Sequence, residues 1–426
     1  MKITADIVIV GTGVAGLYCA LNLPADRDIL LITKAAVEEN DSFLAQGGIS
    51  MLRDESDYDT YFEDTMRAGH YVNKKESVEI MIRSSQDIIN DLIGFGVDFA
   101  RNDDGTLKFT KEGAHSSPRI CFHEDITGKE ITSKLLQEVQ RRSNIKIIEH
   151  LKMTDIIVRE NRCVGIVTEH PHGAMTEIDA KFTVLATGGI GGLYHNSTNY
   201  PHLTADSLAI ALKHGIELEN MDYVQIHPTT LYSKRKGRRF LITESVRGEG
   251  AVLFNSHMQR FTDELQPRDV VSKAIWKQME EDNRPYVWLS MKPIPKEHIL
   301  SHFPNIYQRC LEEGYDITKD CIPVVPAQHY FMGGIKIDKY AKTSMDNLYA
   351  AGETACNGVH GKNRLASNSL LESLVFAKRA AKRIAEEYDD YEVVTPEIDL
   401  ESYRGCDKDY IQIVRAEIEK EQKKHE

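Results

Sequence analysis

Long hydrophobic runs are missing from this 426-residue sequence: no stretch of about 18 or more consecutive apolar residues occurs. A membrane-spanning helix needs about 20 such residues, so the sequence predicts no membrane partner. The first residues, MKITADIVIVGTG, have the pattern of a buried strand and not the charged start and apolar centre of an export signal. We therefore expect a cytoplasmic protein.

Paired cysteines and excess positive charge are also missing. The seven cysteines include no CxxC pair, which argues against a disulfide framework and against a zinc or iron–sulfur site, so we expect no metal. A formal net charge of −13 disfavours nucleic acid and anionic membranes as partners. The one dense basic patch, SKRKGRR at 233–239, has the composition of a solvated hairpin tip.

Apolar strands and amphipathic helices alternate along most of the chain. Residues 5–10 (ADIVIV) predict a buried strand, 11–23 a Gly-rich turn opening a helix, and 28–33 (DILLIT) a second strand. Further helices are predicted near 57–69, 76–95 and 128–143, and strands between 145 and 187 with a hairpin turn at Asn161. The pattern is typical of a large α/β fold.

Between about 222 and 330 the prolines cluster and the elements become short, which predicts an inserted α+β capping domain. Longer strand and helix patterns then return. We therefore expect a discontinuous first domain, residues 1–221 and 331–388, interrupted by the capping domain at 222–330. A short helical C-terminal tail is predicted for residues 389–426.

The turn GTGVAG has the GxGxxG spacing of a nucleotide-binding loop between a strand and a helix. Gly11 suits the tight turn, Gly13 lets the backbone approach a pyrophosphate, and Gly16 allows close helix packing. A nicotinamide-binding unit expects an acid after the second strand, where this chain has Lys34. Two further small-residue turns, at 184–192 and 347–353 (the latter ending in Glu353), favour an extended two-nucleotide cofactor, and FAD is the natural candidate.

Several motifs, taken in order and spacing, resemble the flavoprotein family of succinate dehydrogenases, fumarate reductases and L-aspartate oxidases over residues 1 to about 388. They are GTGVAG, SFLAQGGIS, VLATGG, QIHPTTL, TESVRGEGAVL, PRDVVSKAI, VPAQHYFMGGI and AAGETACNGVHGKNRLASNSLLE. The resemblance implies a Rossmann-like FAD-binding domain with an inserted cap. In the membrane-complex members a histidine five residues before the Gln of AQGG is bonded to the flavin; Asp41 stands there, so non-covalent FAD is expected.

The FAD contacts implied by the motif and the resemblance are Gly11, Thr12, Gly13, Val14, Ala15, Gly16, Lys34, Asp41, Ser42, Phe43, Leu44, Ala45, Gln46, Gly47, Gly48, Asp206, Glu353, Ser369 and Leu370.

Cationic and hydrogen-bonding residues also gather at turns of the capping segment and its hinges. A four-carbon dicarboxylate needs two anion clamps, and the planar guanidinium of arginine fits a carboxylate. Taken singly, each such side chain is more often a core or salt-bridge residue. The resemblance implies that the substrate is bound by His227, Thr243, His329 and Arg364, with Gln225, Leu241 and Ser367 lining the pocket.

The resemblance also implies that Arg268 is the essential catalytic arginine, grouped with His227 and Glu112. Because arginine keeps its proton, a stabilising, positioning or relay role is physically easier for it than that of a base. Glu112, in KEGAHSSPR, matches the aspartate oxidase form of its loop. Aspartate differs from succinate by one ammonium group, so a carboxylate at this place would select aspartate; the alternative is an ordinary loop acid.

The resemblance therefore implies oxidation of L-aspartate to iminoaspartate with oxygen or fumarate as acceptor, at the start of NAD biosynthesis, with hand-over of the product to quinolinate synthase. The alternatives are a soluble fumarate reductase or succinate dehydrogenase, and a flavin-binding scaffold without turnover. Only about 38 residues follow the last motif, fewer than aspartate oxidases commonly have.

Overall fold

A seven-stranded sheet forms the centre of the first unit in the computed structural model, which describes residues 2–234 and 237–425. The strand order is β5-β2-β1-β8-β7-β6, and β15 also pairs with β8. The strands are β1 Lys2–Val10, β2 Ile29–Ile32, β5 Ile145–Ile148, β6 Lys152–Arg159, β7 Arg162–Glu169, β8 Met175–Leu185 and β15 Leu348–Ala350. The pairs β1–β2, β1–β8, β2–β5 and β8–β15 are parallel, whereas β6–β7 and β7–β8 are antiparallel.

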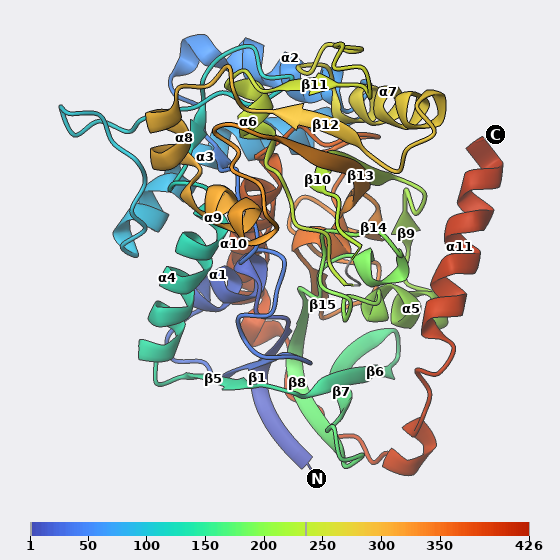
Figure 1. The fold of residues 1–426 in the computed structure, drawn as a ribbon. Helices are drawn as coiled ribbons and strands as arrows, with labels where there is room; N and C mark the ends of the chain where they lie inside the picture. The colour runs from blue at the N-terminus through green and yellow to red at the C-terminus, as the bar shows by residue number, and fades with distance from the viewer. Residues whose placement is uncertain (1, 235–236, 426) are drawn as a thin grey trace.

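The predicted alternation of strands and helices is confirmed. The helices of this unit are α1 Val14–Asn22, α2 Tyr58–Ala68, α3 Lys75–Gly94, α4 Thr127–Arg141, α5 Asp206–Lys213 and α10 Asn368–Glu387. Helix α1 packs against α4 and α10 (Figure 1). All residues of β2 are buried, as expected for a parallel strand covered on both faces. Asn161 makes the β6–β7 hairpin turn at φ 59°.

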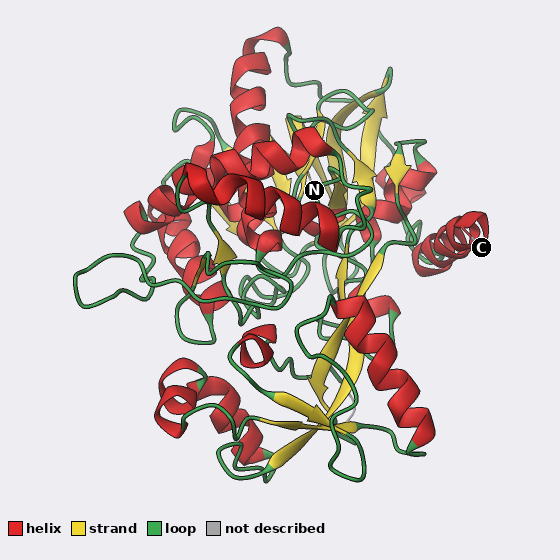
Figure 2. Ribbon diagram, turned by 90° about the horizontal axis from the view of Figure 1, so that it is seen from above, coloured by secondary structure: helices red, strands yellow, loops and turns green. Residues whose placement is uncertain are grey.

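A second, four-stranded sheet has the order β10-β13-β12-β11. Its strands are β10 Val224–Leu231, β11 Val252–Phe254, β12 Val287–Ser290 and β13 Cys321–Phe331, with the helices α6 Glu244–Gly248, α7 Arg268–Glu281, α8 Lys296–His302 and α9 Pro304–Glu312. Leu253, Ile275 and Leu289 belong to a hydrophobic cluster separate from the main core. Figure 2 shows this sheet with its helices at one end of the molecule.

Smaller elements complete the fold. They are β3 Ile49–Ser50, β4 Ile120–Cys121, β9 Leu218–Glu219, β14 Gly334–Lys336, β16 Ala355–Cys356, and the 3-10 turns η1 Glu55–Asp57, η2 Gly191–Leu193, η3 Gly352–Thr354, η4 Tyr388–Asp390 and η5 Leu400–Tyr403. The C-terminal tail ends in α11 Tyr410–His425, which packs against α5 (Figure 1).

All seven cysteines lie within the described part of the chain and are free. Among the described helices, none combines the length and the hydropathy needed to span a bilayer.

The solvated tip expected at 233–239 is confirmed for the described residues Lys234, Gly237 and Arg238, which are exposed. Residues 235–236 lie outside the described residues. Arg238 lines the large cavity discussed below, and Arg239 donates hydrogen bonds to Asn196. Arg238 stays exposed, although it also lines part of the cavity.

Candidate active site

A cavity of about 1620 Å³, partly open to solvent, lies between the Gly-rich turn after β1, the loop 39–48 and the ends of the second sheet. Nearly all of the residues predicted to bind cofactor or substrate line it. The exceptions are Gly16, Phe43 and Gln225. A lining that runs from the glycine turn to the second sheet suits an extended cofactor together with a small substrate.

The glycine turn lies against the cavity at the start of α1. A Cβ on Gly11, which has φ +117°, would lie 2.0 Å from the carbonyl oxygen of Ala186. Gly13 is the N-cap of α1, so the backbone N–H groups of that helix end face the cavity. A Cβ on Gly16 would lie 2.0 Å from the Gly11 carbonyl oxygen, so Gly16 allows close packing and does not line the cavity. This arrangement fits a pyrophosphate group.

Lys34 forms an ion pair across the cavity wall. Its Nζ lies 2.7 Å from Oδ2 of Asp206, the first residue of α5, and 3.2 Å from the Thr204 hydroxyl. Burial alone would raise the pKa of Asp206, but Lys34 holds it below its ordinary value. The acid missing after β2 is therefore supplied by a segment 172 residues away.

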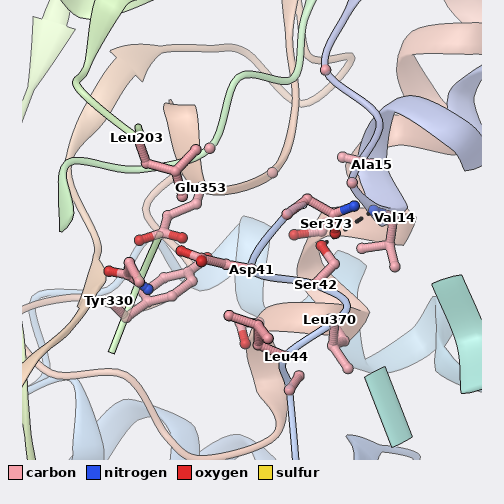
Figure 3. A pocket seen from close by; sticks show the side chains of 18 of the residues that line it. Val14, Ala15, Asp41, Ser42, Leu44, Leu203, Tyr330, Glu353, Leu370 and Ser373 are labelled. Carbon is pink, nitrogen blue, oxygen red and sulfur yellow. Dashed lines mark hydrogen bonds between the residues drawn. The ribbon is translucent and has the colours of Figure 1, made fainter. Parts of the chain in front are cut away.

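The loop 39–48 closes over the start of α1. The Ser42 hydroxyl accepts a hydrogen bond of 3.2 Å from the Val14 N–H, and Figure 3 shows this contact. Asn40 accepts from the Phe43 N–H. The ring of Phe43 contacts Lys129, 5.8 Å from its centroid, and lies outside the cavity lining.

Two half-buried carboxyl groups, Asp41 and Glu353, lie near Tyr330 on the other side of the cavity (Figure 3). Burial raises the pKa of Glu353 to about 8 and that of Asp41 to about 7. Asp41 Oδ1 accepts from the Tyr200 N–H, whereas its buried Oδ2 has no hydrogen-bond partner among the described residues. The carboxyl groups and the open acceptor of Asp41 fit the polar groups of FAD.

Four nitrogen-bearing side chains gather at the substrate end. His227 and His329 have ring centroids 5.1 Å apart, and Arg268 and Arg364 line the same cavity. Burial, and then Arg268, lower the pKa of both histidines well below the ordinary value, so both are neutral. Burial lowers the pKa of Arg364 to about 10, so it keeps its charge at neutral pH, and its guanidinium lies 4.5 Å from the Tyr330 ring centroid. Two arginines and two neutral histidines suit a dianion.

His227 presents a hydrogen-bond donor to the cavity. Its Nδ1 accepts the Thr229 N–H at 3.2 Å, which assigns the proton of the neutral ring to Nε2. Nε2 is buried and has no partner among the described residues. This N–H is positioned for a carboxylate oxygen of a ligand.

Arg268 belongs to a buried chain of charges. Its Nε donates to Glu244 at 2.5 Å, its Nη1 donates to Gln225 at 2.8 Å, and Arg247 lies 3.3 Å from the same Glu244 oxygen. Burial would raise the pKa of Glu244, but Arg268 and Arg247 hold it below the ordinary value. Gln225 also donates to the Arg364 carbonyl oxygen, so it orients both arginines from outside the cavity lining.

Glu112 faces the cavity and is 2% exposed. Its oxygens accept hydrogen bonds from Ser245 at 3.0 Å and from Ser367 at 2.5 Å. Glycines make room for this loop: a Cβ on Gly47 would lie 2.4 Å from Glu112 Oε1, and one on Gly113 would lie 2.4 Å from Glu244 Oε1. The interpretation of Glu112 as an ordinary solvated loop acid does not fit this burial.

The cavity also has lining residues that the sequence analysis missed. They include Thr198, Asn199, His202, Leu203, Arg238, Tyr330 and Ser373. Tyr330 directly follows His329, which was the one available signal for it. The 196–203 segment carries no motif, so only its packing brings it to the cavity.

One cluster of metal-ligating types occurs among the described residues: ligand atoms of Glu249, His298 and His302 lie within 4.8 Å of one another. His298 and His302 contact the two different oxygens of Glu249 at 2.5 and 2.7 Å. These hydrogen bonds satisfy the carboxylate without a cation. The expected absence of a metal stays a prediction.

Comparison with known proteins agrees with this geometry. The family described as FAD binding domain matches residues 6–370. L-aspartate oxidase of Clostridium perfringens is 51% identical over 408 residues, which cover 95% of this chain and 92% of that protein. L-aspartate oxidase of Clostridium acetobutylicum is 50% identical, over 90% and 88% of the two chains. A variant of E. coli quinol fumarate reductase FrdA superposes with a TM-score of 0.86 at 29% identity, over 97% of this chain and 74% of that one.

Proposed function

This chain belongs to the L-aspartate oxidase family of FAD-binding flavoproteins, and on that premise we propose that it oxidises L-aspartate to iminoaspartate. The observation that carries the proposal is the placement of the Glu112 carboxylate in the same cavity as the His227, Arg268, His329 and Arg364 cluster. The cluster suits two carboxylates, and Glu112 suits the ammonium that distinguishes aspartate from succinate.

FAD, when bound, supplies the hydride acceptor. The glycine turn, Lys34 with Asp206, and the loop 39–48 would hold it, together with the other cofactor residues predicted from the sequence. Asp41 replaces the histidine of the covalent members, which supports non-covalent binding.

The remaining steps belong to side chains of the protein. Arg364, His329 and the Nε2–H of His227 bind the carboxylates, with Thr243, Leu241 and Ser367 completing the wall and Gln225 orienting the arginines. Arg268 stabilises negative charge, and its bond to Glu244 and on to Arg247 offers a buried path for a proton.

The proposal also includes the electron acceptor, the pathway and the location of the reaction. Oxygen or fumarate accepts the electrons, the reaction opens NAD biosynthesis, and quinolinate synthase receives the iminoaspartate. We place the reaction in the cytoplasm, as expected from the composition. The capping domain is proposed at 222–330, since a sheet with its own core runs from β10 to β13.

Soluble fumarate reduction is the second candidate, supported by the structural similarity to the fumarate reductase subunit. One experiment separates the two. The FAD-loaded protein is mixed anaerobically with L-aspartate or with succinate, and bleaching of the flavin absorbance is followed. We expect bleaching by L-aspartate; bleaching by succinate alone would overturn the proposal in favour of the second candidate, and bleaching by neither would indicate a scaffold.

A further inference from the structure

His115 follows Glu112 in the same loop, contacts the segment 363–367 and is 3% exposed. Its Nδ1 lies 2.9 Å from Nη1 of Arg119, and its Nε2 lies 3.0 Å from the carbonyl oxygen of Ala366. A guanidinium only donates, so Nδ1 accepts and the ring proton is on Nε2, which donates to Ala366. Both hydrogen bonds therefore require the neutral imidazole in one tautomer.

The far side of this histidine is held by a buried ion network. Arg119 is fully buried and bonds Asp57 at 2.9 Å and Asp64 at 2.7 Å. Asp64 also accepts from the backbone N–H of Ser116, in the same loop. Since one arginine faces two carboxylates, its charge is compensated, and the network anchors the loop to η1 and α2.

Through its contact with Ala366, His115 is also connected to two residues at the substrate end of the cavity. Ala366 stands between Arg364 and Ser367, and the Ser367 hydroxyl donates to Glu112. The backbone N–H of His115 in turn donates to the Glu112 carbonyl oxygen at 3.3 Å. His115 thus connects the turn bearing Glu112 to the segment bearing Arg364 and Ser367, although it does not line the cavity itself.

We propose that His115 is a positioning residue for substrate selectivity: through Arg119 and the Ala366 carbonyl it fixes the Ser367–Glu112 pair that recognises the ammonium of an amino dicarboxylate. This role rests on the proposed function. A dicarboxylate without an ammonium needs the arginine clamps but not this pair. Loss of His115 therefore weakens recognition of L-aspartate more than that of fumarate.

The test compares His115→Ala, His115→Gln and His115→Asn, with His172→Ala, an exposed hairpin histidine, as control. KM and kcat are measured for L-aspartate oxidation and for fumarate reduction, with flavin content and the Tm of each variant. In H115A we expect KM for L-aspartate to rise about 10-fold, as for outer-shell supports of other sites, while KM for fumarate changes less than about 3-fold. H115Q, whose amide can reach Ala366, recovers most of the loss.

Equal losses with both substrates, together with lower flavin content, would overturn the selectivity role and indicate a structural one. Should H115A fail to fold, H115N and H115Q decide, because Asn can meet Arg119 but not Ala366: we expect the selectivity loss in H115N only, and equal values would overturn the role. Wild-type protein that does not oxidise L-aspartate would overturn the proposed function and this role together. Wild-type oxidation with unchanged H115A kinetics would overturn this role alone.

Discussion

The hydroxyl of Ser367 donates a 2.5 Å hydrogen bond to Glu112 inside the cavity. Burial raises the pKa of Glu112, and the neighbouring Glu244 adds to the rise. A ligand ammonium at this carboxylate would favour its charged form. The pair therefore links the protonation of Glu112 to the presence of an amino group on the substrate.

Glu112→Gln keeps the shape of the side chain and removes its charge. We expect KM for L-aspartate to rise about 10- to 100-fold, since hydrogen bonds to charged groups contribute roughly 1.5–3 kcal/mol. Fumarate reduction, which involves no ammonium, should lose much less. Steady-state kinetics with both substrates check this, and equal losses would remove the selectivity role of Glu112.

Arg268→Leu removes the guanidinium that bonds Glu244 and Gln225. We expect kcat to fall at least about 10²- to 10³-fold, the usual cost of losing a group that stabilises developing charge. Flavin content, measured by absorbance after purification, should be unchanged because Arg268 lies at the substrate end. Loss of FAD from the variant would instead indicate that Arg268 supports folding.

Gly113→Ala places a methyl group 2.4 Å from Glu244 Oε1, where two arginines hold that carboxylate. We expect a lower kcat/KM for L-aspartate and a Tm lowered by a few degrees, since forced overpacking costs about 1–3 kcal/mol. Gly94→Ala, at the end of α3 with no atom within 4 Å of the added carbon, is the matched control. Similar behaviour of the two variants would contradict the tight packing at Gly113.

Glu353 makes apoprotein stability depend on pH. Burial raises its pKa from 4.5 to about 8, so between these values the folded state binds a proton that the unfolded state releases. Its contribution is complete below pH 4.5 and is lost as the pH rises to about 8. We expect the free energy of unfolding to fall across this window by on the order of a few kcal/mol, and less in Glu353→Gln. Denaturant titrations at several pH values measure it; parallel curves for both proteins would contradict it.

Asp41 gives a test of how FAD is attached. The cavity wall has a carboxyl group at this position, not the imidazole that forms the flavin bond in the covalent members. We expect acid precipitation of the FAD-loaded protein to release all of its flavin into the supernatant. Flavin fluorescence remaining in the pellet after denaturing electrophoresis would show a covalent bond.

Local sequence patterns were sufficient for most of the secondary structure. The apolar run before Gly11 and the amphipathic run after it became β1 and α1, because side-chain periodicity and glycine conformation act over a few residues. Nearly all of the side chains named from the motifs also line the cavity. Composition correctly indicated that Arg238 is exposed, but not that it lines part of the cavity, because charge alone does not show which segments packing brings together.

The sequence by itself determined the strand and helix order, the glycine turn and the identity of the candidate side chains. Only the tertiary structure decided that Lys34 meets Asp206, and that Ser245 and Ser367 both donate hydrogen bonds to Glu112. These contacts join segments more than 100 residues apart. They depend on how two sheets and their connecting loops pack together, and no short-range preference of the chain encodes that arrangement.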